Sequence, residues 1–570
     1  MKRRDFLGLT AGAVTAAANI RGAQTRQQHD SATSDFEFLN RSTGEGPYRQ
    51  THAGALPHIF LITADMVSPD FYLPSRPVSR LLHLPAIRSL QQDGVFFSNA
   101  FCTVPLCAPS RASYLTGRYS YILGNGERAP QGLASELNAH DIIWPEYLRA
   151  AGYIARHSGK CHIGTEKFIE AFGENDHPWN TWYPPIYTDD GYLDYQRQLG
   201  VKPQKYSREI VFLQQDRKTP GNSVGGWITQ GDGKPFPLEA QYSYYLVHRA
   251  TRELEDILTS PATRNRPIYY QLDLFDPHQP LSIPEGFEAR EKELAASLEL
   301  PETYQKVRAR NWQPFPNQPP IYDLYRDYWG LYNPDSLRAY RIAYALQMEL
   351  VDQVIGRFLA YLKSRGLYDN SLIIFNSDHG EMNGRWALID KGVYLYPDVL
   401  RAPLILKPPR SMQISPRTIQ APVSLMDIGP TVLELVGLQP QARFDGCSLL
   451  SYFVNERSSA DRNLLFFGGW HVGVNFACGI EHWHTDGAHY LYSYNCSSRI
   501  DELYDLNAVE AENLAQRREY ASIRKEMIER LGTFLRQDPR WTGYWSEFRV
   551  TKYFDLPNQQ GDMQLSGGSR

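Results

Sequence analysis

The sequence predicts an α/β fold in which helices sandwich a large mixed, mostly parallel β-sheet, with a smaller C-terminal α+β subdomain. Two observations predict the sheet: short apolar runs alternate with segments of helical periodicity, and two of these runs end just before an aspartate. This alternation is typical of parallel strands covered by helices. The subdomain is predicted because short aromatic strands and turns replace the alternation after about residue 440.

The first expected strand, HIFLIT at 58–63, ends just before Asp65, and SLIIFN at 371–376 ends just before Asp378. The remaining strands of the sheet are expected at 95–100, 153–157, 268–275 and 403–406. In open α/β sheets, ligands bind beyond the carboxyl ends of the strands. Both aspartates are therefore expected at the edge of the sheet that binds a ligand.

Helices are expected where apolar residues recur at helical spacing. Two of them cover about 84–93 and 143–151 and end at glycines, and a third covers 241–258. The longest carries a stripe at i, i+4 spacing, formed by Leu346, Leu350, Val354, Phe358 and Leu362. In the C-terminal subdomain, short strands over 474–494 precede a helix at 521–535.

Two regions, about 175–240 and 281–335, are rich in Pro, Trp and Tyr and lack a clear period. We expect them to be long loops over the active edge that shape substrate choice. Trp179, Trp182 and Trp227 lie in the first region. They are candidates for stacking on sugars, although packing within the loops is the commoner role for such side chains.

Composition excludes several classes of protein. The 570 residues include 59 basic and 63 acidic side chains, a net charge of −4. Binding of nucleic acid over the whole surface needs a basic excess, so no nucleic-acid partner is expected. A mean hydropathy of −0.45 excludes a multi-span membrane protein. Six cysteines in this length exclude a disulfide scaffold, although pairing of Cys102 with Cys161, or of either with Cys107, stays open.

Residues 107–117 read CAPSRASYLTG, and Pro109 lies near the first turn of an expected helix. A cysteine at a helix start lies near the positive end of the helix dipole, which favours its thiolate. The position of Cys107 alone therefore indicates an activated thiol, with a buried structural cysteine as the alternative.

The pattern Cys-x-Pro-Ser-Arg followed by Thr-Gly resembles the signature of the formylglycine-dependent sulfatases, which have an alkaline-phosphatase-like fold. Further segments resemble motifs of that family in the family's order. They are Asp65, GKCHIG at 159–164, DPHQP at 276–280, SDHGEMNG at 377–384, DKG at 390–392 and DELYDL at 501–506. The resemblance spans roughly residues 57–515.

The resemblance implies that a formylglycine-generating maturation enzyme oxidises Cys107 to formylglycine (3-oxoalanine). The hydrated aldehyde would attack the sulfur of a sulfate ester. Asp65, Cys107, Asp378 and His379 would hold a metal ion, for which Ca²⁺ is expected. Mn²⁺ or another divalent ion stays open because Met66 stands where many members carry a second Asp or a Gln, and a thioether is a poor ligand for Ca²⁺. Whether the nearby Asp70 substitutes also stays open.

The resemblance also assigns roles to the remaining site residues. Lys160, Lys391 and His278 would bind the sulfate oxygens, and His278 or Lys391 would protonate the leaving oxygen. His162 would deprotonate the hydrated aldehyde when sulfate is expelled. Arg111 would orient residue 107 and neutralise the carboxylates around it.

The expected function is hydrolysis of sulfate esters, on a sulfated glycan or a small sulfate ester. One alternative is a phosphodiesterase or phosphonate monoester hydrolase, which shares the fold, the modified cysteine and a pair like Asp378-His379. The other is an inactive glycan-binding protein of the same fold. The intact motifs argue against the inactive protein, and Met66 argues weakly for it.

The N-terminus, residues 1–23, resembles a twin-arginine export signal, because Arg3 and Arg4 precede a short apolar run and small residues. This predicts use of the bacterial Tat translocon, a periplasmic or secreted location, and no membrane span in the mature form. The expected organisation continues with a linker over 24–55 and a catalytic domain over 56–440. A C-terminal subdomain over 441–558 and a flexible tail over 559–570 complete it.

Overall fold

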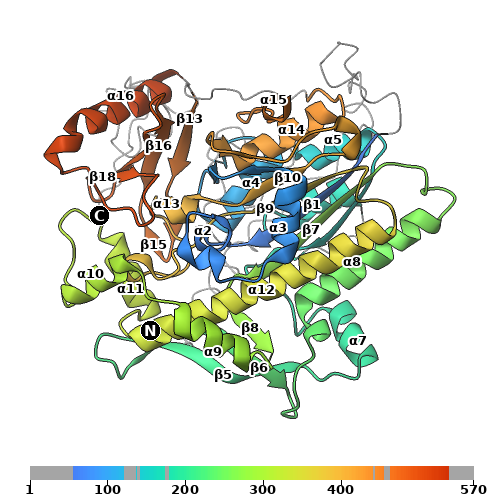
Figure 1. Ribbon diagram of the computed structural model, residues 1–570, viewed down its shortest axis with the longest axis horizontal. Coiled ribbons are helices and arrows are strands. Elements are labelled where there is room, and N and C mark those ends of the chain that lie inside the picture. The colour runs from blue at the N-terminus through green and yellow to red at the C-terminus, as the bar shows by residue number, and fades with distance from the viewer. Residues whose placement is uncertain are drawn as a thin grey trace, which may run out of the picture. The chain divides into compact units, whose positions relative to one another are not determined.

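Strand β1 (His58–Asp65) lies at the centre of a seven-stranded sheet with the order β11-β2-β10-β9-β1-β7-β4 (Figure 1). It pairs in parallel with β9 (Ser371–Ser377) on one side and with β7 (Ile268–Pro277) on the other. The outer strands are β4 (Ile154–Gly159), β10 (Leu404–Lys407), β2 (Val95–Phe97) and β11 (Arg417–Ile419). Only β10 runs antiparallel to its neighbours in this sheet, so the mixed, mostly parallel sheet is confirmed.

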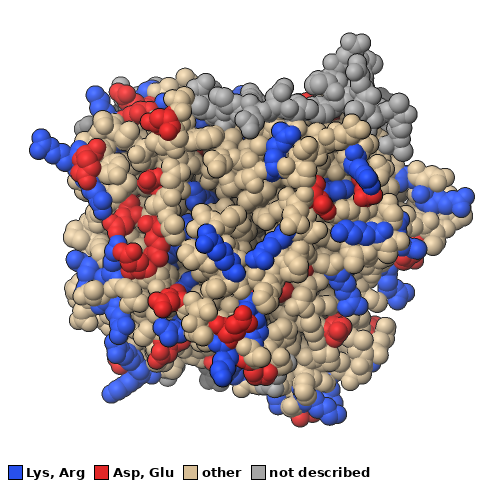
Figure 2. Space-filling view, in the orientation of Figure 1, with Lys and Arg blue, Asp and Glu red and all other residues tan. Residues whose placement is uncertain are grey.

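The computed structural model describes residues 56–120, 137, 141–173, 179–284, 286–440, 443–454 and 462–537. The predicted export signal over 1–23, the linker over 24–55 and the tail over 559–570 lie outside these residues and stay predictions. No helix in the described ranges has both the length and the apolar composition to cross a membrane. On the face drawn in Figure 2, basic and acidic side chains lie interspersed.

Two groups of helices cover the two faces of the sheet (Figure 1). One group is α3 (Pro85–Asp93), α8 (Tyr242–Thr259) and α12 (Pro334–Ser364). The other is α4 (Cys107–Thr116), α5 (Trp144–Ala150), α6 (Thr165–Phe172) and α14 (Ile428–Leu435). Neighbouring residues of β7 show the two faces, because Tyr269 packs on Trp144 at 5.1 Å between ring centroids and Tyr270 packs on Phe358 at 6.2 Å. This alternation follows from the period of two along a strand.

The two regions expected to be long loops are largely regular structure, so that prediction was wrong. The first contains α7 (Asp190–Gln198), β5 (Gln204–Leu213) and β6 (Pro220–Gln230). The second contains β8 (Leu281–Pro284), α9 (Glu288–Ser297), α10 (Glu302–Ala309) and α11 (Ile321–Trp329). Strands β5, β6 and β8 form one sheet, in which β8 joins β6 from a distant part of the chain. Such long-range pairing leaves little periodic signal in the local sequence.

The strand expected over 95–100 is interrupted. After β2 the chain turns at Ser98 and Asn99, whose side chains donate to the carbonyls of Ile419 and Gln420 at 3.2 and 2.7 Å. The next short strand, β3 (Ala100–Phe101), pairs with β12 (Val423–Ser424) in a separate two-stranded sheet.

The C-terminal part contains a four-stranded antiparallel sheet with the order β13-β16-β17-β18. Its strands are β13 (Asn463–Phe467), β16 (Ala477–Trp483), β17 (His489–Asn495) and β18 (Ile500–Asp505). Helix α16 (Ala521–Gln537) packs on β16 and β17. The smaller α+β unit expected from the sequence is therefore present. The short elements α2 (Pro69–Tyr72), α13 (Pro397–Leu400), α15 (Ser451–Val454), β14 (Trp470–His471) and β15 (Gly473–Val474) complete the α-helices and β-strands of the described residues.

Candidate active site

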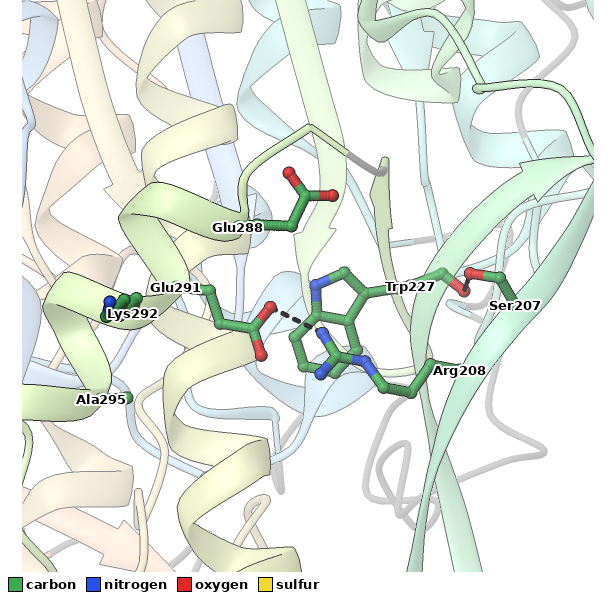
Figure 3. A pocket seen from close by; sticks show the side chains of 7 residues that line it. All are labelled: Ser207, Arg208, Trp227, Glu288, Glu291, Lys292 and Ala295. Atoms are coloured by element: carbon green, nitrogen blue, oxygen red, sulfur yellow. Dashed lines mark hydrogen bonds and ion pairs between the residues drawn. The ribbon is translucent and has the colours of Figure 1, made fainter.

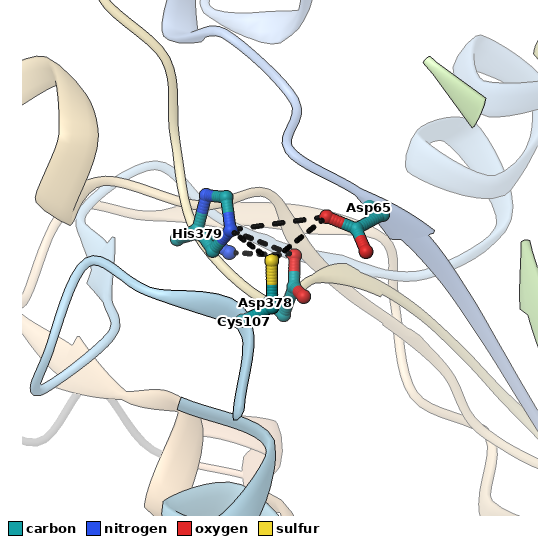
Figure 4. A group of neighbouring side chains, drawn as sticks. All are labelled: Asp65, Cys107, Asp378 and His379. Atoms are coloured by element: carbon teal, nitrogen blue, oxygen red, sulfur yellow. Dashed lines mark hydrogen bonds and ion pairs between the residues drawn. The ribbon is translucent and has the colours of Figure 1, made fainter. Parts of the chain in front are cut away.

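The four residues predicted to hold a metal lie together at the carboxyl edge of the central strands (Figure 4). Asp65 ends β1, Asp378 and His379 follow β9, and Cys107 begins helix α4. One ligand atom from each lies within 4.8 Å of the other three, and all four side chains are buried. Cys107 Sγ is 3.2 Å from Nε2 of His379 and 3.6 Å from Oδ1 of Asp65. The parallel pairing of β1 with β9 brings both aspartates to this edge, as expected.

Arg111 extends from the second turn of α4 into the same cluster. Its Nε donates to Oδ2 of Asp378 at 2.9 Å, and its Nη2 lies 3.4 Å from Oδ2 of Asp65. Its Nη1 donates to the carbonyl of Lys160 at 2.9 Å. The guanidinium is fully buried. It thus lies between the carboxylates of the cluster, and its role in orienting residue 107 stays a prediction.

Lys160 and His162 approach Cys107 from the loop after β4. Lys160 Nζ donates to Oδ2 of Asp65 at 2.6 Å and to the carbonyl of Trp182 at 3.2 Å. His162 shares a hydrogen bond with the Cys107 thiol, and burial together with the Lys160 charge lowers the pKa of its imidazole. A neutral imidazole beside residue 107 is able to accept a proton.

His278 and Lys391 form a second pair of basic residues at the site. Lys391 Nζ contacts Nε2 of His278, and Nδ1 of His278 lies 2.5 Å from the carbonyl of Gln279. Asp390 Oδ1 is 3.1 Å from Lys391 Nζ. Burial opposes the charged ammonium, but Asp390, Cys107 and Asp65 outweigh it and raise the pKa of Lys391. Lys391 is therefore a protonated donor in a buried site.

The cluster has the charges of a site for a cation. Burial and Asp65 raise the pKa of Asp378. Burial also acts to raise the pKa of Asp65, but the charges of Lys160, His278 and Arg111 outweigh it and lower that pKa below its ordinary value. Burial disfavours charge on His379, yet Asp378 and Cys107 raise its pKa to about 9. Without a metal the site thus holds a proton on His379. Two carboxylates, an imidazole and residue 107 fit a divalent ion.

Met66 was expected to be a poor ligand, and Asp70 was left open as its substitute at the metal site. The Met66 N–H donates to Oδ1 of Asp378 at 3.1 Å, and its φ of 64° lies in the left-handed region. Asp70 is bound elsewhere, with its two oxygens 2.7 and 2.8 Å from the guanidinium of Arg385. It also accepts from Asn383 at 2.9 Å. Asp70 is therefore not a substitute ligand, because its oxygens are committed to these partners.

Comparison with known families decides the class of protein. A family model described as Sulfatase matches residues 57–438, about two thirds of the chain. The chain belongs to the sulfatase family. A second model, described as N-sulphoglucosamine sulphohydrolase, C-terminal, matches residues 384–537. The predicted family and enzyme class, sulfuric ester hydrolase, are thereby confirmed.

Individual relatives of this sulfatase are distant. The N-acetylglucosamine-6-O-sulfatase of Bacteroides thetaiotaomicron is 25% identical over 505 residues, covering 79% of this chain and 81% of the relative. Among solved structures, the phosphonate monoester hydrolase of Agrobacterium radiobacter has a TM-score of 0.61 at 20% identity and covers 84% of this chain and 96% of its own. A structure with the substrate D-glucosamine-2-N,6-O-disulfate has a TM-score of 0.57 at 18% identity, with coverage of 85% and 99%. At these identities the structural matches show the fold alone.

Two residues of the sulfatase site, Asp273 and His471, were not predicted from the sequence. Asp273 is buried in β7, where Arg111 Nη1 lies 3.3 Å and His157 Nε2 lies 3.1 Å from its carboxylate. The signal for it was a charged residue inside the apolar run at 268–275. His471 lies near Lys391 and hydrogen-bonds Tyr325 at 2.8 Å. Burial lowers the pKa of His471 to about 4, and no local pattern pointed to it.

The three tryptophans considered for sugar stacking have different surroundings. Trp179 is 8% exposed and packs on Tyr242, whereas Trp182 is 45% exposed. Trp227 is buried, and the Arg208 guanidinium lies 3.5 Å from its ring centroid. Trp227 and Arg208 line a pocket of about 520 Å³ together with Ser207, Glu288, Glu291, Lys292 and Ala295 (Figure 3). Only Trp182 of the three therefore presents a substantial free ring surface.

None of the six cysteines is in a disulfide. Cys102 donates to the carbonyl of Val399, and Cys161 contacts the carbonyl of Trp179 at 3.3 Å. The Cys102–Cys161 pairing left open by the sequence is therefore absent, and no disulfide occupies Cys107.

Proposed function

We propose that this sulfatase hydrolyses sulfate esters of carbohydrates, with residue 107 converted to formylglycine and with a divalent cation, expected to be Ca²⁺, bound beside it. One observation carries the proposal: the ligand atoms of Asp65, Cys107, Asp378 and His379 lie within 4.8 Å of one another. The cationic side chains of Lys160 and Lys391 border this cluster, as the charges that lower the pKa of Cys107 indicate. A sulfate group would thus meet positive charge on several sides.

The residues of the chain would divide the chemistry between them. Lys160 and Lys391 would bind sulfate oxygens, and the bound cation would supply a further fixed positive charge. Formylglycine would supply the nucleophilic oxygen at position 107. His162 would take the proton released from residue 107, because its lowered pKa keeps it neutral.

A proton donor for the leaving alcohol is provided by the Lys391–His278 pair. The Gln279 carbonyl at 2.5 Å can only accept, so Nδ1 of His278 carries a hydrogen and Nε2 accepts from Lys391. The raised pKa of Lys391 keeps its proton in place until an oxygen with developing negative charge arrives.

A carbohydrate substrate is supported by the aromatic surface next to Lys160. The carbonyl of Trp182 accepts from Lys160 Nζ at 3.2 Å, and the rings of Trp182 and Tyr183 are 45% and 43% exposed. Apolar faces of sugar rings stack on such surfaces. A relative is named N-acetylglucosamine-6-O-sulfatase, and a solved neighbour holds a disulfated glucosamine. Both names agree with a sulfated amino sugar as the substrate.

The rival activity is phosphonate or phosphate diester hydrolysis, because a phosphonate monoester hydrolase shares the fold. The Asp378-His379 pair does not separate the two activities.

Export through the Tat pathway to the periplasm or medium and oxidation of Cys107 by a maturation enzyme complete the proposal. Export is tested by changing Arg3 and Arg4 to Lys, after which unchanged export would contradict it.

The deciding measurement is the mass of the tryptic peptide Ser89–Arg111 from protein made in its native host, followed by fragmentation to locate any change. Conversion of Cys107 to formylglycine lowers the mass of this peptide because an aldehyde replaces the thiol. Cys102 lies in the same peptide and serves as the internal unmodified control.

Activity assays complete the test. The Cys107→Ala variant should lose hydrolysis of sulfated amino sugars, whereas Cys102→Ala, at a buried thiol bound to Val399, should retain it. Exhaustive chelation should abolish activity and Ca²⁺ should restore it. If Cys107 is converted to formylglycine but the protein hydrolyses only phosphonates, the rival activity is established. If Cys107 is unmodified and the protein is inactive, the glycan-binding alternative is established.

A further inference from the structure

A second cluster of metal-ligand side chains lies in the C-terminal sheet. His482 lies near the end of β16, His484 lies one residue beyond that strand, and Glu526 lies on α16. One ligand atom from each residue lies within 4.8 Å of the other two. The cluster shares no residue with the catalytic site, and none of the sulfatase motifs includes it.

His482 is oriented with a bare nitrogen available. Its Nδ1 lies 3.1 Å from Oδ1 of Asn463 on the neighbouring strand β13, and the side chain is buried. An amide oxygen only accepts hydrogen bonds, so Nδ1 carries the hydrogen and Nε2 keeps its lone pair. A hydrogen bond of this kind on the far nitrogen is how metal-binding histidines are usually held.

His484 lies beside His482 and has a nitrogen without a partner. Its Nε2 is buried and has no hydrogen-bond partner among the described residues. Its ring centroid lies 4.4 Å from that of His482, and its Nδ1 lies 4.0 Å from Oε1 of Glu526. A buried nitrogen without a partner costs stability, and a cation bound at that nitrogen would remove the cost.

Arg530 competes for the carboxylate of the cluster. Its Nε donates to Oε1 of Glu526 at 2.9 Å, one turn along α16. Both side chains are more than one third exposed, so this ion pair is weak. Arg530 is able to move into solvent while Glu526 binds a cation. The positive charge of Arg530 then competes with the cation for the Glu526 carboxylate.

We propose that His482, His484 and Glu526 form a binding site for Zn²⁺. Two imidazoles and one carboxylate are a donor set that zinc accepts, and Ca²⁺ prefers oxygen ligands alone. A tetrahedral zinc with bonds of about 2.1 Å places its ligand atoms about 3.4 Å apart, so small rotations of His484 and of the partly exposed Glu526 would complete the site. Water would occupy the fourth position. The ion would join β16 to α16 and hold the helix on the sheet.

The test uses the full-length protein saturated with Ca²⁺, so that the catalytic site is filled by its expected ion. Zn²⁺ is then added, excess is removed by gel filtration, and bound zinc is measured per chain. The protein should retain one more zinc ion than the His482→Ala/His484→Ala variant. Zinc should also raise Tm in the parent protein and not in this variant. His83→Ala, at an exposed histidine outside the cluster, is the matched control and should behave as the parent does.

Two single substitutions keep the test decisive if the double variant folds poorly. Glu526→Gln, at a partly exposed residue, should weaken zinc binding at least tenfold, and Arg530→Ala should strengthen it by removing the competitor. Co²⁺ in place of Zn²⁺ should give the strong visible absorption of a tetrahedral site, lost in Glu526→Gln. Equal zinc content and equal affinity in the parent, Glu526→Gln and Arg530→Ala would overturn the proposal.

Discussion

Nε of Arg111 lies 2.9 Å from Oδ2 of Asp378, and the remaining nitrogens of the same guanidinium face Asp65 and Asp273 at 3.4 and 3.3 Å. All of these side chains are fully buried. One cation thus stands between three carboxylates from β1, β7 and the end of β9. The core of the sheet and the candidate catalytic centre share this cation.

Removal of that cation should destabilise the whole domain. We expect Arg111→Ala to lower the free energy of unfolding by about 3–5 kcal/mol, because it leaves buried carboxylates unpaired. Arg111→Lys should lose less, since it keeps the charge and loses the forked geometry. Denaturant unfolding measures both. Arg410→Ala removes a surface pair with 83% and 67% exposed partners and should change stability by less than about 1 kcal/mol. If Arg111→Ala and Arg410→Ala lowered the free energy of unfolding equally, Arg111 would not be the cation that pairs with the buried carboxylates.

Substitution of Gly159 tests how closely β4 approaches β7 next to Lys160. A Cβ at Gly159 would lie 1.9 Å from the carbonyl oxygen of Asp273, and its φ is 122°. We expect Gly159→Ala to cost more than about 3 kcal/mol or to prevent folding. Gly152 also has a positive φ, of 96°, but a Cβ there would have no atom within 4 Å, so Gly152→Ala should cost only about 1 kcal/mol. Thermal unfolding compares the two, and equal Tm losses would mean that the close approach is absent.

Glu502 should make stability depend on pH. Burial raises its pKa from 4.5 to about 7, and the hydroxyls of Tyr504 and Tyr322 contact its carboxyl group. The folded protein therefore keeps this proton up to about pH 7, whereas the unfolded chain releases it near pH 4.5. Stability from this group is full below pH 4.5 and is lost as pH rises to 7.

Glu502→Gln should remove that dependence. Relative to the parent, the free energy of unfolding of the variant should rise by about 3 kcal/mol between the two pH values. Urea unfolding at several pH values measures the difference. A constant difference across this range would show that Glu502 ionises normally in the folded protein.

Met66 offers a gain-of-function test of the metal site. Met66→Asp would add a carboxylate oxygen next to Asp65, and Asp tolerates the left-handed φ of 64° better than most residues. We expect Ca²⁺ to bind on the order of tenfold more tightly, because calcium affinity follows the number of charged ligands. The metal-free variant should be less stable, since three buried carboxylates then repel one another.

Thermal unfolding with Ca²⁺ and with chelator separates these effects. The difference in Tm between the two conditions should be larger for Met66→Asp than for the parent, and Met66→Leu, which adds no oxygen, should match the parent. The same calcium-dependent shift in both variants would place Met66 outside the reach of the ion.

Much of the sheet and the site was predictable because the signals are local. The apolar runs before Asp65 and Asp378 marked β1 and β9, and the parallel rule placed both aspartates at one edge. The motifs then marked Cys107 and the basic residues around it. These are short patterns in which a few neighbouring residues determine both the backbone and the chemistry.

The remaining features depend on contacts between distant segments. Strand β5 pairs with β6, β6 pairs with β8, and β5 packs on α12, where Phe212 meets Tyr340 at 6.1 Å between ring centroids. The sequence of β5 has no clean alternation, so its conformation follows from its partners. Asp273 and His471 were missed for the same reason, because their roles depend on which residues the fold brings to them.

The burial of Cys107 sets an order of events during synthesis. The ribosome produces Cys107 272 residues before His379, and strand β9 must join β1 before the pocket around the thiol closes. After that step the side chain is only 5% exposed. If Cys107 is oxidised as proposed, the enzyme would therefore act on the nascent or unfolded chain, and the rate at which β9 is made and docked would limit the time for that reaction.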